Sequence, residues 1–352
     1  MWYAVAAHSV NGASFEELAQ RATAAREADR IVEAIDLYRQ AVELKSDWPE
    51  GWWYLGTLLY DSDRYVEGAR AFSEFVKLTG KEPGLAFLGL CEFETGDYTD
   101  AIEHLRRGLE GKLPSDIERP VRFHLGLLLN RSSLFELARA QFQTLVAGGV
   151  RNPIFVAALG LNALERSMLP DETPADQREI VLAAGNAEYF WLAGDIAAAG
   201  EAVRSLVGKY PDAPGTHYFY AHYLLATTPG DGIMQELGRE LALNPQSAGA
   251  RGMMALVLWQ QKRLSEALPL ARKVVDEHRP SPFAEYVYAM CLDDLSQASQ
   301  HLEQAVRYDP TGLEYHMALA HVYSKAGRYQ DARRERISSI DMARQAVPRG
   351  PS

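Results

Sequence analysis

The chain has 352 residues, with 36 Lys and Arg against 47 Asp and Glu, so its formal net charge is −11. This acidic balance argues against nucleic-acid binding, because neutralising a phosphate backbone requires a basic surface. The two cysteines, Cys91 and Cys291, cannot form a disulfide framework, and no stretch reaches the ~18 apolar residues that a membrane span requires.

Residues 1–13 form a segment without the periodicity that follows. The first seven residues are apolar apart from Tyr3, but the segment lacks the basic start and the long apolar core of a signal peptide. Two interpretations stay open: the start of a cytoplasmic protein, or the remnant of a signal peptide in a periplasmic one. The cytoplasmic interpretation comes first and the periplasmic one is the alternative.

From residue 34 onward, a position that is usually small is followed four residues later by one that is usually apolar. The first members are Ala34, Gly68, Ala101, Ala138, Ala199, Ile233, Ala267, Ala298 and Ala332. Neighbouring members differ by 34, 33, 37, 61, 34, 34, 31 and 34 residues. Six of these eight intervals lie within about three residues of the period of a helix–turn–helix repeat. The spacing predicts an all-α array of paired helices.

A second set of small residues lies twelve positions before most members of the first set, inside apolar runs. Its members include Gly56, Gly89, Gly126, Ala187, Ala221, Ala255 and Ala320. Glycine inside a helix costs ~1 kcal/mol relative to alanine, so the three glycines predict close approach of a partner helix. Turn sequences such as Gly96-Asp97-Tyr98 separate the two sets, because Gly suits a helix end and Asp can cap the next helix.

Three stretches resemble the tetratricopeptide repeat family, in its bacterial type. They are Trp52-x-x-Leu55-Gly56, Leu88-Gly89 followed by Gly96-Asp97-Tyr98, and Gly327-Arg328-Tyr329 followed by Ala332. The resemblance covers residues 14–346 in about nine degenerate repeats. It implies a right-handed superhelical solenoid whose concave groove is lined by the first helix of each pair.

The interval of 61 residues between Ala138 and Ala199 is the largest irregularity. Pro170 and Pro174 exclude a regular helix in the segment between them, so a half-repeat, a loop and a fresh helix from about Ala175 are expected. The segment is either a joint between two sub-arrays or a decayed repeat packed like the others. As a joint, it divides the chain into sub-arrays at 14–168 and 177–346, with a loop at 169–176 and a flexible tail at 347–352.

The chain carries no motif for catalysis. It has no phosphate-binding loop, no His-Glu-x-x-His, no Gly-x-Ser-x-Gly and no dinucleotide fingerprint, so no enzymatic activity, cofactor or metal is expected. His217 and His222, like His316 and His321, lie five residues apart. Five positions separate side chains by about 140° around a helix, so neither pair shares a metal from one helix face.

Positions three before, one after, and four or five after each small marker of the first helix face the groove in the resembled family. Here these positions hold Trp53, Thr57, Tyr60, Phe123, Asn130, Arg131, Glu188, Trp191, Tyr218, His222, Trp259, Tyr286, His321 and Lys325. For Trp53, Tyr60, Tyr218 and Trp259, packing in the core is the alternative if the register differs by one residue. Ala19, Thr23, Trp53 and Thr57 replace the Lys, Asn and Arg with which some family members clamp a chaperone's C-terminal carboxylate, which argues against that activity.

These observations favour a non-catalytic scaffold that binds a protein or peptide segment in its concave groove, in a bacterial assembly or envelope process. Aromatic contacts to an extended or helical segment are the expected binding mode. The chain itself is expected to be a monomer or to self-associate weakly. Two alternatives stay open: a small-molecule or enzymatic pocket at residues 150–176, and head-to-tail self-assembly through the terminal repeats.

Overall fold

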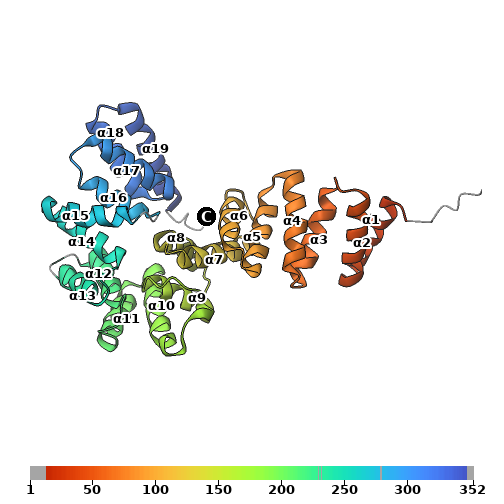
Figure 1. Cartoon of the computed structure of the whole chain (residues 1–352), viewed down its shortest axis with the longest axis horizontal. Coiled ribbons are helices and arrows are strands. Elements are labelled where there is room, and N and C mark those ends of the chain that lie inside the picture. Colours follow the sequence, from red (N-terminus) through yellow and green to blue (C-terminus); the bar gives the residue numbers. More distant parts are fainter. Residues whose placement is uncertain (1–12, 229, 231, 278–279, 347–352) are drawn as a thin grey trace, which may run out of the picture. The chain divides into compact units, whose positions relative to one another are not determined.

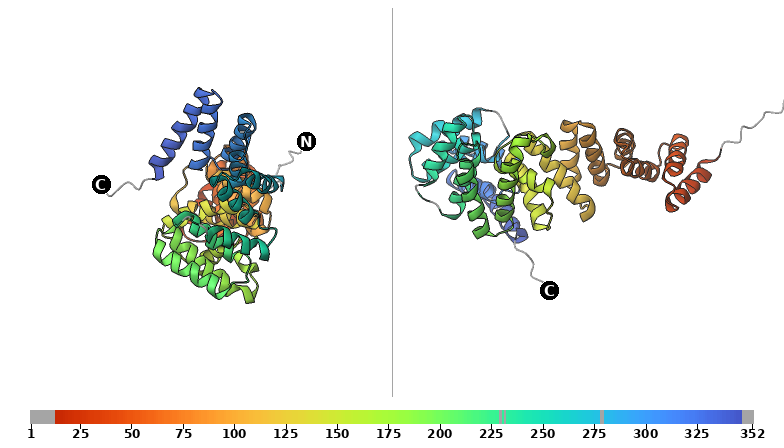
Figure 2. Two further views of the ribbon diagram at one scale, coloured as in Figure 1. Left: turned by 90° about the vertical axis from the view of Figure 1, so that its left-hand side faces the viewer. Right: turned by 90° about the horizontal axis from the view of Figure 1, so that it is seen from below.

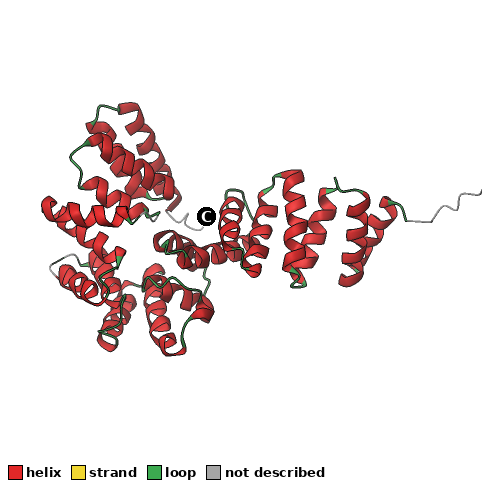
Figure 3. Cartoon of the chain, viewed as in Figure 1, coloured by secondary structure: helices red, strands yellow, loops and turns green. Residues whose placement is uncertain are grey.

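A computed structural model describes residues 13–228, 230, 232–277 and 280–346. These residues form helices, turns and loops, and no strand occurs among them (Figure 3). The predicted N-terminal segment, apart from Ala13, and the predicted tail at 347–352 lie outside the described residues. No helix of the described part is both long and apolar enough to cross a membrane.

The helices follow one another along the chain with short connections (Figure 1). Their bounds are α1 Phe15–Glu27, α2 Ile31–Leu44, α3 Pro49–Asp61, α4 Tyr65–Thr79, α5 Glu82–Thr95, α6 Tyr98–Gly108, α7 Ser115–Arg131, α8 Phe135–Ala147, α9 Pro153–Ala163, α10 Arg178–Leu192, α11 Ile196–Lys209, α12 Thr216–Thr227, α13 Gly232–Leu243, α14 Ala248–Gln260, α15 Leu264–Asp276, α16 Pro282–Met290, α17 Leu295–Tyr308, α18 Leu313–Lys325 and α19 Tyr329–Ala346. Two short 3-10 helices, η1 Pro170–Glu172 and η2 Ala175–Gln177, lie between α9 and α10.

The chain divides into two compact units, residues 1–125 and 126–352. In the first unit α1 packs with α2, α3 with α4 and α5 with α6, while α2 and α4 also contact the next pair. In the second unit the pairs are α10 with α11, α12 with α13, α14 with α15, α16 with α17 and α18 with α19 (Figures 1 and 2). The predicted all-α array is confirmed as a helical-repeat solenoid.

The small marker residues lie where paired helices approach each other most closely. A Cβ on Gly56 would lie 2.8 Å from the Phe72 ring, and one on Gly126 would lie 2.4 Å from the Phe142 ring. Both phenylalanines are completely buried. The predicted close approach at the helical glycines is therefore confirmed, and it explains why the chain tolerates their cost.

The irregular segment has the predicted order of elements. Helix α9 is followed by a connection without α-helix that contains η1 and η2, and then by α10. Helix α9 packs directly against α10, and a Cβ on Gly160 or Gly185 would lie 1.8 Å from the Val181 or Val156 carbonyl oxygen. Backbone therefore meets backbone at this crossing. The segment lies within the second unit.

Both cysteines are free and buried. Burial raises the pKa of Cys91 to about 12 and that of Cys291 to about 11, so both are protonated thiols at neutral pH. They contribute to packing and have none of the character of reactive thiolates.

Candidate binding groove

Four of the predicted groove residues lie together in the second unit. Helix α10 supplies Glu188 and Trp191, and α12 supplies Tyr218 and His222. The Trp191 and His222 ring centroids are 4.8 Å apart, and the Tyr218 and His222 rings stack with centroids 6.1 Å apart. Adjacent first helices of the array thus bring these four side chains together, and we call them the inner cluster.

Arg139 of α8 completes the inner cluster. Its Nε donates a hydrogen bond of 2.7 Å to Glu188 Oε1, and its guanidinium carbon lies 4.7 Å from the centre of the Trp191 ring. Only 1% of Glu188 is exposed; burial raises the pKa of its carboxyl group, and the Arg139 charge opposes that shift. The sequence analysis did not include Arg139, because it lies on the second helix of a pair and the register rule covers first helices.

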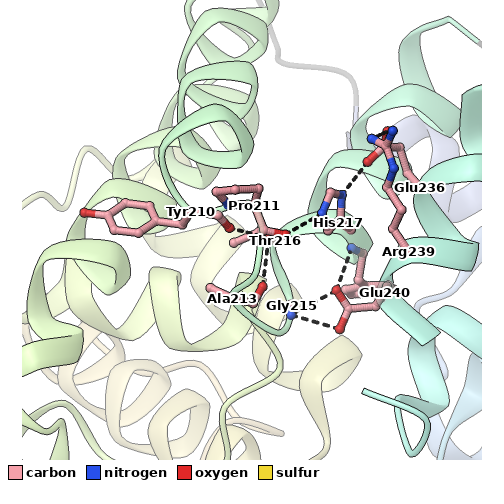
Figure 4. Close-up of polar contacts among 10 residues, drawn as sticks. Tyr210, Pro211, Ala213, Gly215, Thr216, His217, Glu236, Arg239 and Glu240 are labelled. Atoms are coloured by element: carbon pink, nitrogen blue, oxygen red, sulfur yellow. Dashed lines mark hydrogen bonds and ion pairs between the residues drawn. The ribbon is translucent and has the colours of Figure 1, made fainter. Parts of the chain in front are cut away.

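Buried hydrogen bonds hold the start of α12 and so position Tyr218. The Glu240 carboxylate accepts from the Gly215 amide at 2.9 Å and from the Tyr218 amide at 3.2 Å (Figure 4). Glu240 is completely buried, and it satisfies two of the amide groups that a helix start leaves without intrahelical partners. Gly215 adopts φ 92°, which favours glycine at this connection.

A second link ties the same helix start to α13. His217 Nε2 donates to the Pro211 carbonyl oxygen at 2.8 Å, and Nδ1 lies 2.5 Å from Glu236, which also accepts from Arg239 (Figure 4). His316 repeats the arrangement with the Pro310 carbonyl and Glu335, and Arg251 does so with the Pro245 carbonyl and Glu277. Two histidines of the five-residue pairs therefore pack between helices, and the same polar link recurs in three helix pairs.

His222 presents a half-buried imidazole to the inner cluster. Burial, with a smaller contribution from the Arg139 charge, lowers its pKa to about 3, so the ring is neutral at pH 7. A neutral imidazole carries one hydrogen-bond donor and one acceptor. Neither ring nitrogen has a hydrogen-bond partner among the described residues.

A hollow of about 280 Å³ opens beside the inner cluster. Its walls are formed by Glu136, Arg139, Ala140, Gln143, Tyr218, His222, Leu225, Met253, Phe283, Asp309, Glu314 and Tyr315. These residues come from α8, α12, α14 and α16, from the connection after α17, and from α18. The hollow exists because the helices after α8 curve back until the start of α16 contacts α8 (Figure 1).

Two carboxyl groups make the contacts that close this curve. Glu136 accepts from Ser281 Oγ at 3.1 Å, and Glu165 accepts from Ser247 Oγ at 3.2 Å. Ser281 and Ser247 cap the starts of α16 and α14. Glu136 is exposed and Glu165 is half-buried, and protein atoms surround both side chains. Desolvation raises the pKa of each glutamate to about 7.

A sequence pattern could have predicted one of these two glutamates but not the other. Glu165 lies five residues after Gly160, so the register rule would have included it had α9 been treated as a first helix. Glu136 meets a residue 145 positions away, and no local pattern signals that contact. Gly249 leaves the room that Glu165 needs, because a Cβ there would lie 2.1 Å from Glu165 Oε1.

In the first unit the predicted groove residues lie in an aromatic environment. Trp53 is half-buried, and its ring centroid lies 5.2–5.8 Å from those of Phe72, Phe75 and Phe87. The Tyr60 ring lies 5.4 Å from Phe87, and burial raises its pKa to about 12. The remaining first-unit residues are half-buried: the Thr57 hydroxyl donates to the Tyr54 carbonyl, and Phe123 contacts the His124 ring.

The other predicted residues of the second unit are separate from the inner cluster. Asn130 is buried and donates to the Arg166 carbonyl at 2.9 Å, while Arg131 forms an ion pair with Glu172. Trp259 is half-buried among apolar side chains, and the Tyr286 ring lies 5.6 Å from that of Tyr315. His321 and Lys325 are exposed on α18, where His321 lines a shallow apolar groove with Met317 and Ile340.

No group of three or more His, Cys, Asp or Glu side chains in the described part of the chain could hold a metal ion. The inner cluster offers neutral and paired polar groups together with aromatic faces. This combination suits reversible recognition of polar and aromatic groups.

Comparisons with known proteins agree with the repeat architecture. The tetratricopeptide repeat family matches residues 19–83, 235–284 and 288–341. No curated protein matches the chain. MamA (41-end) from Desulfovibrio magneticus RS-1 is 18% identical, covers 48% of this chain and 97% of its own, and has a TM-score of 0.38.

Two further solved structures cover more of the chain. The APC/C hetero-tetramer Cut9-Hcn1 is 12% identical over 94% of this chain and 66% of its own, with a TM-score of 0.41. A tetratricopeptide repeat protein from Parabacteroides merdae ATCC 43184 is 12% identical over 80% of this chain and 99% of its own, with a TM-score of 0.35. The family matches in both units and the repeated helix pairs identify this chain as a tetratricopeptide repeat protein, a member of a family whose fold serves in general as a protein-interaction scaffold.

Proposed function

We propose that the second unit binds a segment of a partner protein on the inner cluster, without catalysing a reaction. The observation that carries the proposal is His222, a neutral imidazole with no hydrogen-bond partner among the described residues, held between Trp191 and Tyr218 beside a hollow. One donor and one acceptor at such a position suit the amide groups of a peptide.

The arrangement of the inner cluster favours binding. Arg139 and Glu188 fix each other through a hydrogen bond, and Arg139 also covers one face of Trp191. A surface that is already ordered loses less conformational entropy when a ligand arrives. Aromatic anchors at interfaces typically contribute about 2 kcal/mol or more when truncated.

The proposal is tested by selecting a random library of 12-residue peptides on the full chain and measuring the enriched peptides by fluorescence polarisation. We expect His222→Leu, which keeps a similar volume but removes both polar groups, to weaken binding at least tenfold. Glu201→Gln, an exposed change on α11, is the matched control and should bind like the wild type. Equal affinity of the wild type and His222→Leu for every enriched peptide would argue against the inner cluster.

Self-association is a second candidate function, favoured by the apolar groove between α18 and α19. Met317 is 58% exposed and Ile340 49% exposed on this last helix pair, a position where another repeat could stack. Light scattering between micromolar and millimolar concentration tests it: Met317→Lys should lower the apparent mass if the groove mediates association. If the apparent mass of both the wild type and Met317→Lys stays constant over this concentration range, self-association is ruled out as the function.

Fewer observations support the predicted alternative, a small-molecule or enzymatic pocket at residues 150–176. Asn162, Glu165 and Ser167 line small hollows next to the inner cluster. A thermal-shift screen with metabolites tests this alternative, because a ligand that binds the folded state raises the melting temperature. Binding lost in Glu165→Gln and kept in Glu201→Gln would support it.

A further inference from the structure

The hollow beside the inner cluster is lined by three carboxyl groups. Glu136, Asp309 and Glu314 all contribute to its walls, and none of them has an ion pair among the described residues. Among the described residues, Arg139 is the one Lys or Arg side chain in the walls, and it is already paired with Glu188. The hollow therefore has an excess of negative charge.

Other acidic side chains of the described residues are paired with arginine. Glu67, for example, contacts both Arg39 and Arg64, and Glu172 contacts Arg131. Glu136 and Glu314 are exposed and Asp309 is half-buried, and carboxylates on the walls of a hollow attract an opposite charge. A cation supplied by a partner would compensate the charges of Asp309 and Glu314.

Aromatic side chains form other parts of the same walls. Tyr218, Phe283 and Tyr315 all line the hollow, and Tyr315 is itself packed against Tyr286. A guanidinium group stacks on aromatic faces and pairs with carboxylates through a planar fork of donors, whereas an ammonium group acts as a compact point charge. Walls that combine carboxyl groups with aromatic rings therefore favour arginine over lysine.

The size of the hollow limits what it can hold. Its volume of about 280 Å³ lies just below the range of roughly 300–1,000 Å³ typical of small-molecule and cofactor sites. A single long side chain suits such a space. Glu136 is partly ionised at pH 7, and in the ionised form it can accept a further hydrogen bond, because an ionised carboxyl has about four lone-pair sites and the described contacts with Ser281 and Phe283 use three of them.

We propose that the partner segment inserts an arginine side chain into this hollow, where Asp309 and Glu314 neutralise its charge, Glu136 accepts a hydrogen bond from it and the aromatic walls stack on its guanidinium. This inference rests on the proposed peptide-binding function and specifies the chemistry of the partner. An acidic anchor at the same place would be repelled.

The test uses the same unbiased library of 12-residue peptides on the full chain. Enriched peptides are expected to share an arginine, and replacing that arginine with citrulline should weaken binding at least tenfold. The double variant Asp309→Asn/Glu314→Gln should weaken binding of the arginine peptide by a similar factor. The double variant should have little effect on binding of the citrulline peptide, because citrulline has no charge with which the two carboxyl groups could interact.

The control is Glu201→Gln/Asp212→Asn, which removes the same number of charges from exposed positions on and after α11. It should bind the arginine peptide like the wild type at 150 mM salt. Peptides that need His222 but carry no basic residue, or that bind the citrulline form equally well, overturn the arginine proposal and leave the binding function standing. If no enriched peptide depends on His222, both proposals fail.

Discussion

Equivalent positions of the repeat have different surroundings in the two units. Trp53 in the first unit and Tyr218 in the second both lie three residues before a small marker. Trp53 is surrounded by three phenylalanine rings, whereas Tyr218 lies beside a neutral histidine, a glutamate and a hollow. The neighbouring helices therefore decide whether a residue at this repeat position packs among aromatic rings or borders a hollow.

Both units contain groups whose pKa is shifted in the direction of the neutral form. In the first unit, burial raises the pKa of Glu92 and lowers that of His124. In the second unit, desolvation shifts the pKa of Glu136 and His222, which line the hollow, and of Glu165, which lies next to them. Polar interiors of this kind cost stability and are typical of functional sites.

The largest expected effect comes from the helix crossing in the second unit. Gly160→Ala would place a methyl group against the Val181 carbonyl oxygen, where only backbone could move, so we expect a loss of more than about 4 kcal/mol of unfolding free energy. Gly56→Ala in the first unit meets the Phe72 ring and should cost about 1–3 kcal/mol. Urea denaturation measures both.

Gly238→Ala is the control for these glycine variants, because nothing lies within 4 Å of a Cβ at that position. It should raise stability by about 0.5–1 kcal/mol through helix propensity alone. A similar loss of unfolding free energy for Gly160→Ala and Gly56→Ala would mean that the two helix crossings tolerate an added methyl group equally.

Breaking the Arg139–Glu188 pair should have the next largest effect. Arg139→Met leaves a buried carboxylate without its partner and should cost about 3–5 kcal/mol, measured by chemical denaturation. The double variant Arg139→Met/Glu188→Leu should recover most of that loss. Arg263→Met, which breaks an exposed pair with Glu266, should leave stability unchanged. An equal loss in both single variants would contradict the burial argument.

Trp53→Ala separates core packing from binding. Removal of the ring from its contacts with three phenylalanines should cost about 3–5 kcal/mol of stability, measured by thermal and urea unfolding. Peptides selected on the inner cluster should keep their affinity for this variant at a temperature where it is folded. His222→Leu should behave in the opposite way, with stability nearly unchanged and binding lost. A Trp53→Ala variant that keeps its stability would place Trp53 outside the core.

The smallest expected effect is a pH dependence. Burial raises the pKa of Glu165 from 4.5 to about 7 in the folded state, so folding favours the protonated form. The resulting stability is fully present below pH 4.5 and is lost as pH rises through 7, by about 1–3 kcal/mol. Glu165→Gln should remove this part of the decline between pH 5 and pH 8 in urea titrations. Glu201→Gln, exposed on α11, should decline like the wild type.

Much of the fold could be predicted from sequence, because the repeat is local. Each helix pair is specified by small residues such as Gly56 and Gly126 at a fixed spacing, and a helix–turn–helix unit contacts mainly its neighbours. The same register placed Glu188, Trp191, Tyr218 and His222 near one another, since equivalent positions of adjacent first helices point to the same side. Two prolines were enough to predict the connection that separates α9 from α10.

The sequence by itself therefore determined the helix pairs and their order, both of which depend on residues fewer than about 40 positions apart. Tertiary structure alone decided that Glu136 meets Ser281 and that Arg139 pairs with Glu188, because these contacts depend on how far the second unit curves. Curvature accumulates from small rotations at every helix contact, and no single sequence position encodes it. The accumulated curvature brings Glu136, Asp309 and Glu314 together around one hollow.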